Sequence, residues 1–216
     1  MAQNDTVKVI GSWSSPFALR ARVALHLKSV NQRVNSLSSL TPSTRKSLSS
    51  SMVTSPSVNP LTSFSTSMKL GPSDPSILPS QPYDRASARF WAQYVDDKCF
   101  GSLDAVAGAK DDEGRKAAAG KLMECLGILE ETFQKSSKGL GFFGGENIGY
   151  IDIACGTLLG PISVIEAFSG VKFLQEETTP GLMKWAERFR THEAVNPYMP
   201  SVEELVAFAK QKFSIQ

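Results

Sequence analysis

Acidic residues are missing from a long part of this chain. No Asp or Glu occurs between Asp5 and Asp74, although the 216 residues include 21 acidic side chains. The overlapping segment, residues 29–80, contains 17 serines and one aromatic residue, Phe64. It also lacks the apolar spacing of a helix or a strand, so the sequence predicts loop or disorder over about residues 29–80.

Long apolar runs, a secretion signal and a strong net charge are absent as well. The chain has no run of 18 consecutive apolar residues, and its start, MAQNDTVKVIGSW, has neither a basic patch nor an apolar stretch. A formal net charge of +2 provides no broad positive surface. We therefore expect a soluble protein of the cytosol that binds neither nucleic acid nor membrane.

The chain contains three cysteines, and their spacing does not match a disulfide or metal-binding motif. Cys99, Cys125 and Cys155 are odd in number, far apart in sequence, and each lies in an apolar segment. This pattern favours reduced core residues over a disulfide framework or a zinc site. We expect no metal site.

A short strand followed by a helix is predicted at the start of the chain. Residues 7–13, VKVIGSW, are typical of a strand with a turn after it, and the segment from Phe17 onward has helical apolar spacing. Pro16 suits the first position of a helix, where its missing N–H has no helical partner. Ser15 is therefore predicted to be the N-cap.

The part after Pro82 is predicted to be all helical. Two long core helices are indicated by apolar stripes at helical spacing, namely Trp91, Val95, Cys99, Leu103 and Val106 in one, and Leu122, Leu126, Leu129 and Phe133 in the other. A buried central helix is predicted over residues 150–168, and further helices over 180–192 and from Ser201 onward. Asp152, three residues after Gly149, is predicted to be a structural cap of the central helix.

Three motifs make the chain similar to the tau class of plant glutathione transferases. They are W-x-S-P-F with R-x-R-V-A-L-x-L-K, at Trp13 to Lys28; S-I-L-P-S-x-P-Y-D-R-A-x-A-R-F-W-A, at Ser76 to Ala92; and F-F-G-G-E-N-I-G-Y-I-D-I-A, at Phe142 to Ala154. The three motifs stand in the family's order, and together they cover nearly all the chain except residues 31–73.

The resemblance implies an α+β fold with two domains. A thioredoxin-like domain would occupy residues 1–80 and an all-α domain residues 81–216. The protein would be a homodimer that uses glutathione as co-substrate, without another cofactor, in detoxification and stress response.

The resemblance also implies which residues bind and react. Ser15 would activate the thiol of glutathione, with Ser14 as the rival, and Ser15 is preferred because the family's serine directly precedes Pro-Phe. Phe17 would line the glutathione pocket, although its spacing indicates the core. The hydrophobic electrophile site would include these residues, for whose aromatic members core packing is an equal alternative: Trp13, Phe100, Asp104, Ala107, Phe208 and Phe213.

The family's glutathione-binding segment is not found in residues 31–72. When codons are chosen for Thr41 to Leu48 and read one base earlier, they give Asn-Pro-Val-His-Lys-Lys-Ile-Pro, which resembles the missing peptide-binding segment. The same shift over Met52 to Pro60 gives a sequence ending in Glu-Ser, the pair that holds the γ-glutamyl group in the family. We therefore predict that this segment is read out of frame, and resequencing the transcript across codons 28–76 tests this prediction.

Three functions remain open at this point. The chain is a transferase that joins glutathione to hydrophobic electrophiles, a binding protein for apolar ligands without turnover, or an inactive product that has lost its glutathione pocket. Retention on immobilised glutathione separates the first from the other two.

Overall fold

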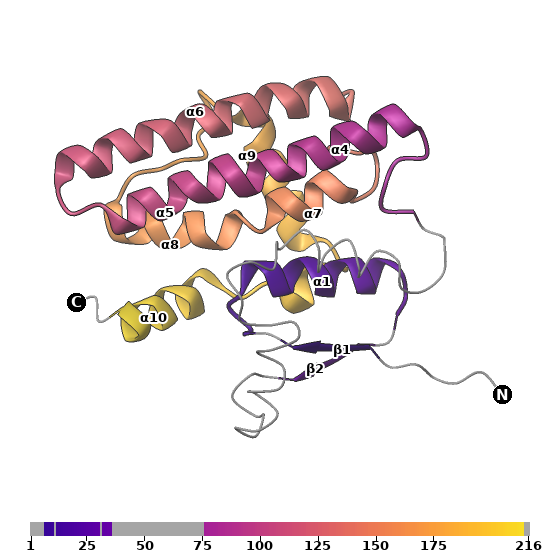
Figure 1. Ribbon diagram of the computed structural model, residues 1–216, viewed down its shortest axis with the longest axis horizontal. Coiled ribbons are helices and arrows are strands. Elements are labelled where there is room, and N and C mark those ends of the chain that lie inside the picture. The colour runs from indigo at the N-terminus through magenta and orange to yellow at the C-terminus, as the bar shows by residue number, and fades with distance from the viewer. Residues whose placement is uncertain (1–6, 11, 31, 36–75, 214–216) are drawn as a thin grey trace. The chain divides into compact units, whose positions relative to one another are not determined.

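The computed structural model describes residues 7–10, 12–30, 32–35 and 76–213, which divide between two units, Met1–Ile77 and Leu78–Gln216 (Figure 1). The described part of the first unit contains two strands and one helix, and the described part of the second is built from helices. This composition confirms the helical C-terminal half that the apolar stripes predict.

A β-α-β segment forms the described part of the first unit. Strand β1 (Val7–Ile10) and strand β2 (Gln32–Asn35) pair in parallel, with Val7 opposite Gln32 and Ile10 opposite Asn35. Helix α1 (Pro16–Leu27) connects them, as parallel pairing requires a crossover. The short strand predicted at the start of VKVIGSW is confirmed, and the chain turns at Trp13 and Ser14.

The prediction of loop or disorder from residue 29 onward is wrong at 32–35. These residues form β2. Backbone pairing with β1 stabilises the strand, although its side chains lack the alternating apolar pattern from which a strand is predicted. The rest of the serine-rich segment, residues 36–75, lies outside the described residues. The predicted frame shift therefore stays a prediction.

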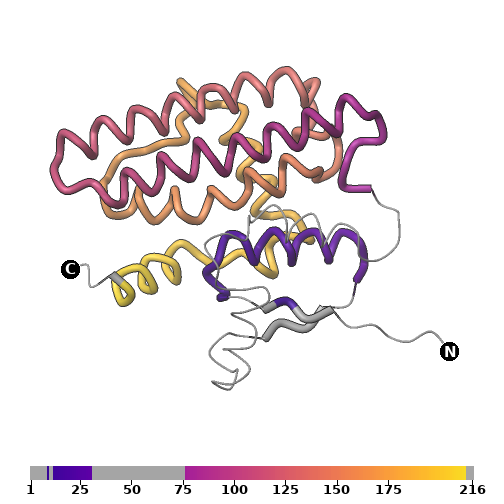
Figure 2. Tube along the Cα trace, in the orientation of Figure 1, coloured from indigo at the N-terminus to yellow at the C-terminus, as the bar shows by residue number. Residues whose placement is uncertain are grey.

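Two antiparallel helical rods open the second unit. Helix α4 (Pro82–Tyr94), a π-helical turn η2 (Val95–Phe100) and helix α5 (Gly101–Gly108) run on as one rod, which Figure 2 shows as a continuous coil. After a short turn, helix α6 (Asp112–Ser137) returns alongside it. Asp111 caps α6 by accepting a hydrogen bond of 2.7 Å from the Gly114 N–H.

Four further helices and one short turn complete the second unit. They are α7 (Tyr150–Gly156), α8 (Leu159–Ser169), α9 (Pro180–Thr191), a 3₁₀ turn η3 (Asn196–Tyr198) and α10 (Val202–Phe213). The predicted central helix over 150–168 is therefore two helices, broken at Thr157 and Leu158. The Thr157 hydroxyl donates 2.6 Å to the Ala154 carbonyl, and such competition with the helical ladder bends or ends helices.

The core of the second unit follows the predicted apolar stripes. Val95, Cys99, Leu103 and Val106 are buried on the first rod, whereas Trp91 is half-buried. Four residues of α6 are buried as well: Leu122, Leu126, Leu129 and Phe133.

Helices α7 and α8 form the most apolar stretch of the described chain. By length and composition Tyr150–Ser169 could span a membrane, with a mean hydropathy of 1.5, but half of it is buried inside the structure. All residues from Asp152 to Leu159 are buried. Its position in the core of the second unit accounts for its apolar composition.

Asp152 connects three segments around the start of α7. Its Oδ2 accepts from the Gly149 N–H at 2.9 Å, and its Oδ1 accepts from the Phe143 N–H at 2.9 Å and the Trp185 Nε1–H at 2.8 Å. The carboxyl group is fully buried. Burial raises its pKa to about 6, while these hydrogen bonds oppose the rise.

A second buried carboxylate holds the start of α9 against α6. Glu130 Oε1 accepts from the Gly181 N–H at 2.9 Å and Oε2 from the Leu182 N–H at 2.7 Å. Glycine at position 181 leaves room for this contact, because a Cβ there would lie 2.5 Å from Gln134 Nε2, 2.7 Å from Glu130 Oε1 and 2.8 Å from Phe133 Cδ1, and these side chains would have to move. The free N–H groups of a helix start are thus satisfied by a side chain 51 residues away in sequence.

Replacing Glu130 with glutamine is expected to lower the free energy of unfolding by about 1–3 kcal/mol, because one N–H of α9 then faces an amide NH₂ instead of an acceptor. Urea denaturation followed by circular dichroism measures this change. Glu131→Gln is the matched control, since Glu131 lies next to it on an exposed face and pairs with Lys135 at 3.2 Å. Equal stability of the two variants would contradict the assigned role of Glu130.

Candidate active site

Ser15 lies in the turn between β1 and α1, at the N-terminus of the helix. Its backbone is extended, with φ −78° and ψ 119°, and its Oγ accepts from the Ala18 N–H at 3.3 Å. The Ser15 N–H donates to the Ser12 carbonyl at 3.2 Å, which fixes the turn. Ser15 is the N-cap of α1 and is half-buried, as expected from the proline that follows it.

An anion next to Ser15 would meet two favourable interactions. The Oγ accepts from Ala18, so the hydroxyl hydrogen remains able to donate to a second group. The N-terminus of α1 carries a partial positive charge from the aligned peptide dipoles of the helix. Both interactions favour the ionised form of a bound acid, such as a thiol.

Ser14 has a different environment from Ser15. Its Oγ lies 2.9 Å from Ser12 Oγ, and its N–H donates to the same Ser12 oxygen at 3.4 Å. The Ser14 hydroxyl is therefore engaged within the turn and takes no part in the helix cap. This geometry distinguishes the two serines that sequence alone leaves as rivals.

Two aromatic residues flank Ser15 in the chain. Trp13 is 45% exposed and Phe17 is 39% exposed, so neither is a core residue. The interpretation of Phe17 as core, which its spacing favours, is therefore wrong. The Phe17 ring lies 5.4 Å from the Arg20 guanidinium carbon, and an arginine over an aromatic face is a favourable arrangement.

The second unit contains a wide groove between α5, α6, α8 and α10. Its volume is about 1230 Å³, and its lining is mainly apolar, with charged residues at the start of α6. Ala107 on α5, Phe168 on α8 and Ala209 on α10 all contribute to its walls. A groove of this size and character suits a hydrophobic small molecule.

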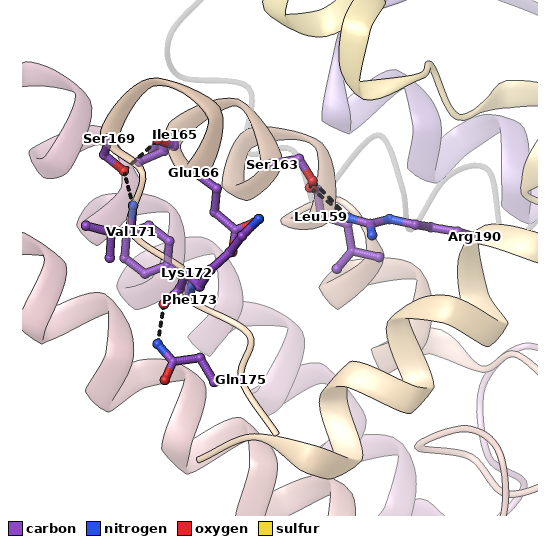
Figure 3. Close-up of polar contacts among 10 residues, drawn as sticks. All are labelled: Leu159, Ser163, Ile165, Glu166, Ser169, Val171, Lys172, Phe173, Gln175 and Arg190. Atoms are coloured by element: carbon purple, nitrogen blue, oxygen red, sulfur yellow. Dashed lines mark hydrogen bonds and ion pairs between the residues drawn. The ribbon is translucent and has the colours of Figure 1, made fainter. Parts of the chain in front are cut away.

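One wall of the groove is the segment that follows α8. Gly170 ends the helix in the left-handed conformation, with φ 69°, and turns the chain back so that Val171 and Phe173 reach the groove. Glu166 fixes this segment, because it accepts from the Phe173 N–H at 2.8 Å and pairs with Lys172 at 3.2 Å (Figure 3).

Arg190 fixes α8 from its other side. Its Nη2 donates to Ser163 Oγ at 2.9 Å and to the Leu159 carbonyl at 3.3 Å, as Figure 3 shows. Burial lowers the pKa of this guanidinium, and the charge of Glu166 opposes the shift. The helix that forms one side of the groove is thus tied to α9.

Comparison with known proteins identifies the family. The chain is 67% identical to glutathione S-transferase U13 of Arabidopsis thaliana over an alignment of 234 residues, gaps included. The alignment covers the whole of each chain. Glutathione S-transferase U14 of the same plant is 57% identical, over 98% of this chain and 92% of its own. This chain belongs to the tau class of the glutathione S-transferases. No family model matches it.

Solved structures agree with the tau-class fold. The tau-class glutathione S-transferase of mango, Mangifera indica, is 44% identical with a TM-score of 0.84, over 94% of this chain and 97% of its own. A rice glutathione S-transferase in complex with glutathione is 25% identical with a TM-score of 0.80, over 96% and 98% of the two chains. The predicted family and fold class are confirmed. The alternatives of a binding protein and of an inactive product gain no support from these relatives.

The site residues predicted for this tau-class chain fall into two groups. Ser15, Trp13 and Phe17 lie together in the first unit. Those of the second unit are Phe100, at the end of the π-helical turn, the exposed Asp104 and Ala107 on α5, and the half-buried Phe208 on α10. The side chain of Phe213 lies outside the described part of the chain.

Among the described side chains of the second unit that were predicted for the electrophile site, one lines the groove of this transferase. Ala107 lines it, whereas Phe100, Asp104 and Phe208 do not. Sequence reasoning missed Val164, Ile165 and Phe168, because they were assigned to a buried central helix. A signal was available, since Val164 and Phe168 are four residues apart and share one face of α8.

Proposed function

We propose that this tau-class transferase binds glutathione with its sulfur next to Ser15 and joins the thiolate to hydrophobic electrophiles. The thiolate is the nucleophile, and a free thiol titrates near pH 8.5, so the enzyme must favour ionisation. The observation that carries the proposal is the position of the Ser15 hydroxyl at the N-terminus of α1. Each unit by which the thiol pKa falls corresponds to about 1.4 kcal/mol.

The electrophile is proposed to bind in the groove of the second unit. Its walls combine small residues, Ala107, Ala119 and Ala209, with the larger Phe168 and Phe173. Apolar walls stabilise an apolar ligand through the surface that both remove from water. The substrate class is therefore hydrophobic, and the acidic and basic residues at the start of α6 lie at one end of the groove.

The cellular setting is proposed from the family. The chain acts as a homodimer in the cytosol and serves detoxification and the stress response. The net charge of +2 is in keeping with a protein whose partners are small molecules.

Replacing Ala107 with tryptophan is expected to raise KM for a hydrophobic electrophile by roughly tenfold, equivalent to about 1.4 kcal/mol, since the indole fills part of the groove. Position 107 is exposed, so the larger side chain leaves the core intact. Steady-state conjugation assays with 1-chloro-2,4-dinitrobenzene measure this change, and the KM for glutathione should stay constant. Ala105→Trp is the matched control, because Ala105 is also exposed on α5 but lines a different groove.

Two outcomes separate the parts of this proposal. If the wild-type chain conjugates the electrophile and Ala107→Trp leaves KM for the electrophile unchanged, the electrophile binds outside this groove. A folded wild-type chain that neither conjugates nor is retained on immobilised glutathione would overturn the proposed function of the chain itself.

A further inference from the structure

The connection that follows α8, residues 170–175, is irregular in conformation but is fixed along its length by hydrogen bonds from side chains (Figure 3). Ser169 Oγ accepts from the Val171 N–H at 3.2 Å. The Lys172 carbonyl accepts from Gln175 Nε2 at 2.6 Å. A loop held in this way can present a side chain to a ligand in one defined position.

Glu166 holds the same connection with both of its carboxylate oxygens. Its Oε1 accepts from the Phe173 N–H at 2.8 Å, and its Oε2 lies 3.2 Å from Lys172 Nζ. The Glu166 side chain is 13% exposed and that of Lys172 is 70% exposed. A hydrogen bond to a charged, largely buried oxygen is strong, whereas an ion pair with an exposed lysine contributes little. The bond to Phe173 is therefore the more important of the two.

The bond from Glu166 acts on a residue that is itself an anchor. The Phe173 side chain is 2% exposed, so its ring is packed in the core of the second unit. Val171 lies between this anchor and the bond from Ser169. The position of Val171 is consequently determined from both sides.

Val171 and Phe168 place exposed apolar surface in the groove. Val171 is 38% exposed and Phe168 is 37% exposed, and both line the groove of about 1230 Å³. Apolar surface of this kind stabilises a ligand that removes it from water. The groove is also larger than the roughly 300–1,000 Å³ of sites for compact, drug-sized ligands. It therefore has room for an extended apolar group.

We propose that Val171 is a specificity-determining residue that contacts an extended apolar tail of the electrophile, and that Glu166 is the positioning residue that holds Val171 in place through Phe173. The substrate class is accordingly an electrophile with a flexible hydrocarbon tail. This inference rests on the proposed function, because it requires the electrophile to bind in this groove.

Two aldehydes with the same reactive group test the contact with the tail. The electrophilic group of trans-2-hexenal and of trans-2-nonenal is the same, and the tails differ by three CH₂ groups. The ratio of their kcat/KM values, nonenal over hexenal, therefore measures the binding of the tail. Each CH₂ fully removed from water raises affinity by about fourfold, so a ratio of about tenfold is expected for the wild type if about half of the added surface is covered.

Variants of the two residues should change this ratio in a linked way. Glu166→Ala and Val171→Asn should each lower it to about threefold, because the tail loses its apolar contact. The double variant should lower it no further, since Glu166 acts through Val171. Glu166→Gln keeps a carbonyl oxygen for the Phe173 N–H and should restore most of the wild-type ratio. KM for glutathione should stay constant throughout.

The control is Glu177→Ala, because Glu177 is exposed on the same connection between α8 and α9. It should keep the wild-type ratio. A purely structural role of Glu166 would lower stability and the activity toward both aldehydes equally, so an unchanged ratio in Glu166→Ala overturns the inference. A wild-type ratio near one, or an equal loss in Glu166→Gln, overturns it as well.

The result can be separated from the test of the proposed function. If Ala107→Trp raises KM for the electrophile while Glu166→Ala keeps the wild-type ratio, only this inference fails. If neither Ala107→Trp nor Val171→Asn has an effect, the electrophile binds outside the groove and both proposals fail.

Discussion

Replacing Ser15 with alanine is expected to lower kcat/KM for conjugation by about a hundredfold, the effect of removing one hydrogen-bond donor from a developing or resident anion in an enzyme site. The variant keeps the helix N-terminus but loses the hydroxyl that would donate to the glutathione sulfur. The thiol should therefore ionise at higher pH. The pH profile of kcat/KM measures this effect directly, because its acidic limb should move upward.

The controls for Ser15 separate catalysis from helix capping. Ser15→Ala also removes the bond from Ala18, which costs about 1 kcal/mol of stability. Ser15→Thr keeps both the cap and the hydroxyl and should retain most of the activity. Ser14→Ala should also retain it, since the Ser14 hydroxyl is engaged with Ser12. Loss of activity in Ser14→Ala, together with an active Ser15→Ala, would assign the role to Ser14.

Replacing Asp152 with alanine is expected to lower the free energy of unfolding by about 3–5 kcal/mol, because two buried N–H groups and one half-buried N–H group then lose their acceptor. The donors belong to Gly149, Phe143 and Trp185, so the loop before α7, the start of α7 and α9 all lose a connection. Urea denaturation measures the loss. Asp104→Ala is the control, since Asp104 is exposed on α5; a stability loss no larger than that of this control would contradict the role of Asp152.

Asp152 is also expected to make stability depend on pH. Its pKa is about 6 in the folded protein and 3.8 ordinarily, so the folded chain binds the proton more tightly. This contribution to stability is present in full below pH 3.8 and is lost as the pH rises through 6, by about 3 kcal/mol in all. Asp152→Asn removes the titration, so its stability relative to wild type should rise across this window. A constant difference from pH 4 to 7 would show that burial does not govern this carboxyl.

The helices of the second unit could be predicted from the sequence because their apolar residues repeat at helical spacing and pack into one core. The break between α7 and α8 was missed, although Gly156 directly before it and Pro161 in the first turn of α8 are local signals of a helix end and a helix start. Strand β2 was also missed. Its residues, QRVN, owe their conformation to pairing with β1, which is a tertiary interaction.

The candidate site was less accessible to sequence reasoning than the fold. Ser15 could be found, because a serine before Pro-Phe at a helix start is a local signal that needs no tertiary information. The groove could not, since its walls come from four helices and from the segment after α8. Phe17 shows the same limit, because its spacing indicates the core although its side chain is 39% exposed.

Both buried carboxylates that organise α9, Glu130 and Asp152, accept hydrogen bonds from residues within 78–216, which supply every donor found for them in the described part of the chain. A change of reading frame in residues 31–72 would leave every one of these bonds intact. Cells degrade chains according to the fraction that is unfolded. A helical unit whose buried polar contacts are unaffected is therefore expected to stay folded, and to resist degradation, in a chain altered in residues 31–72.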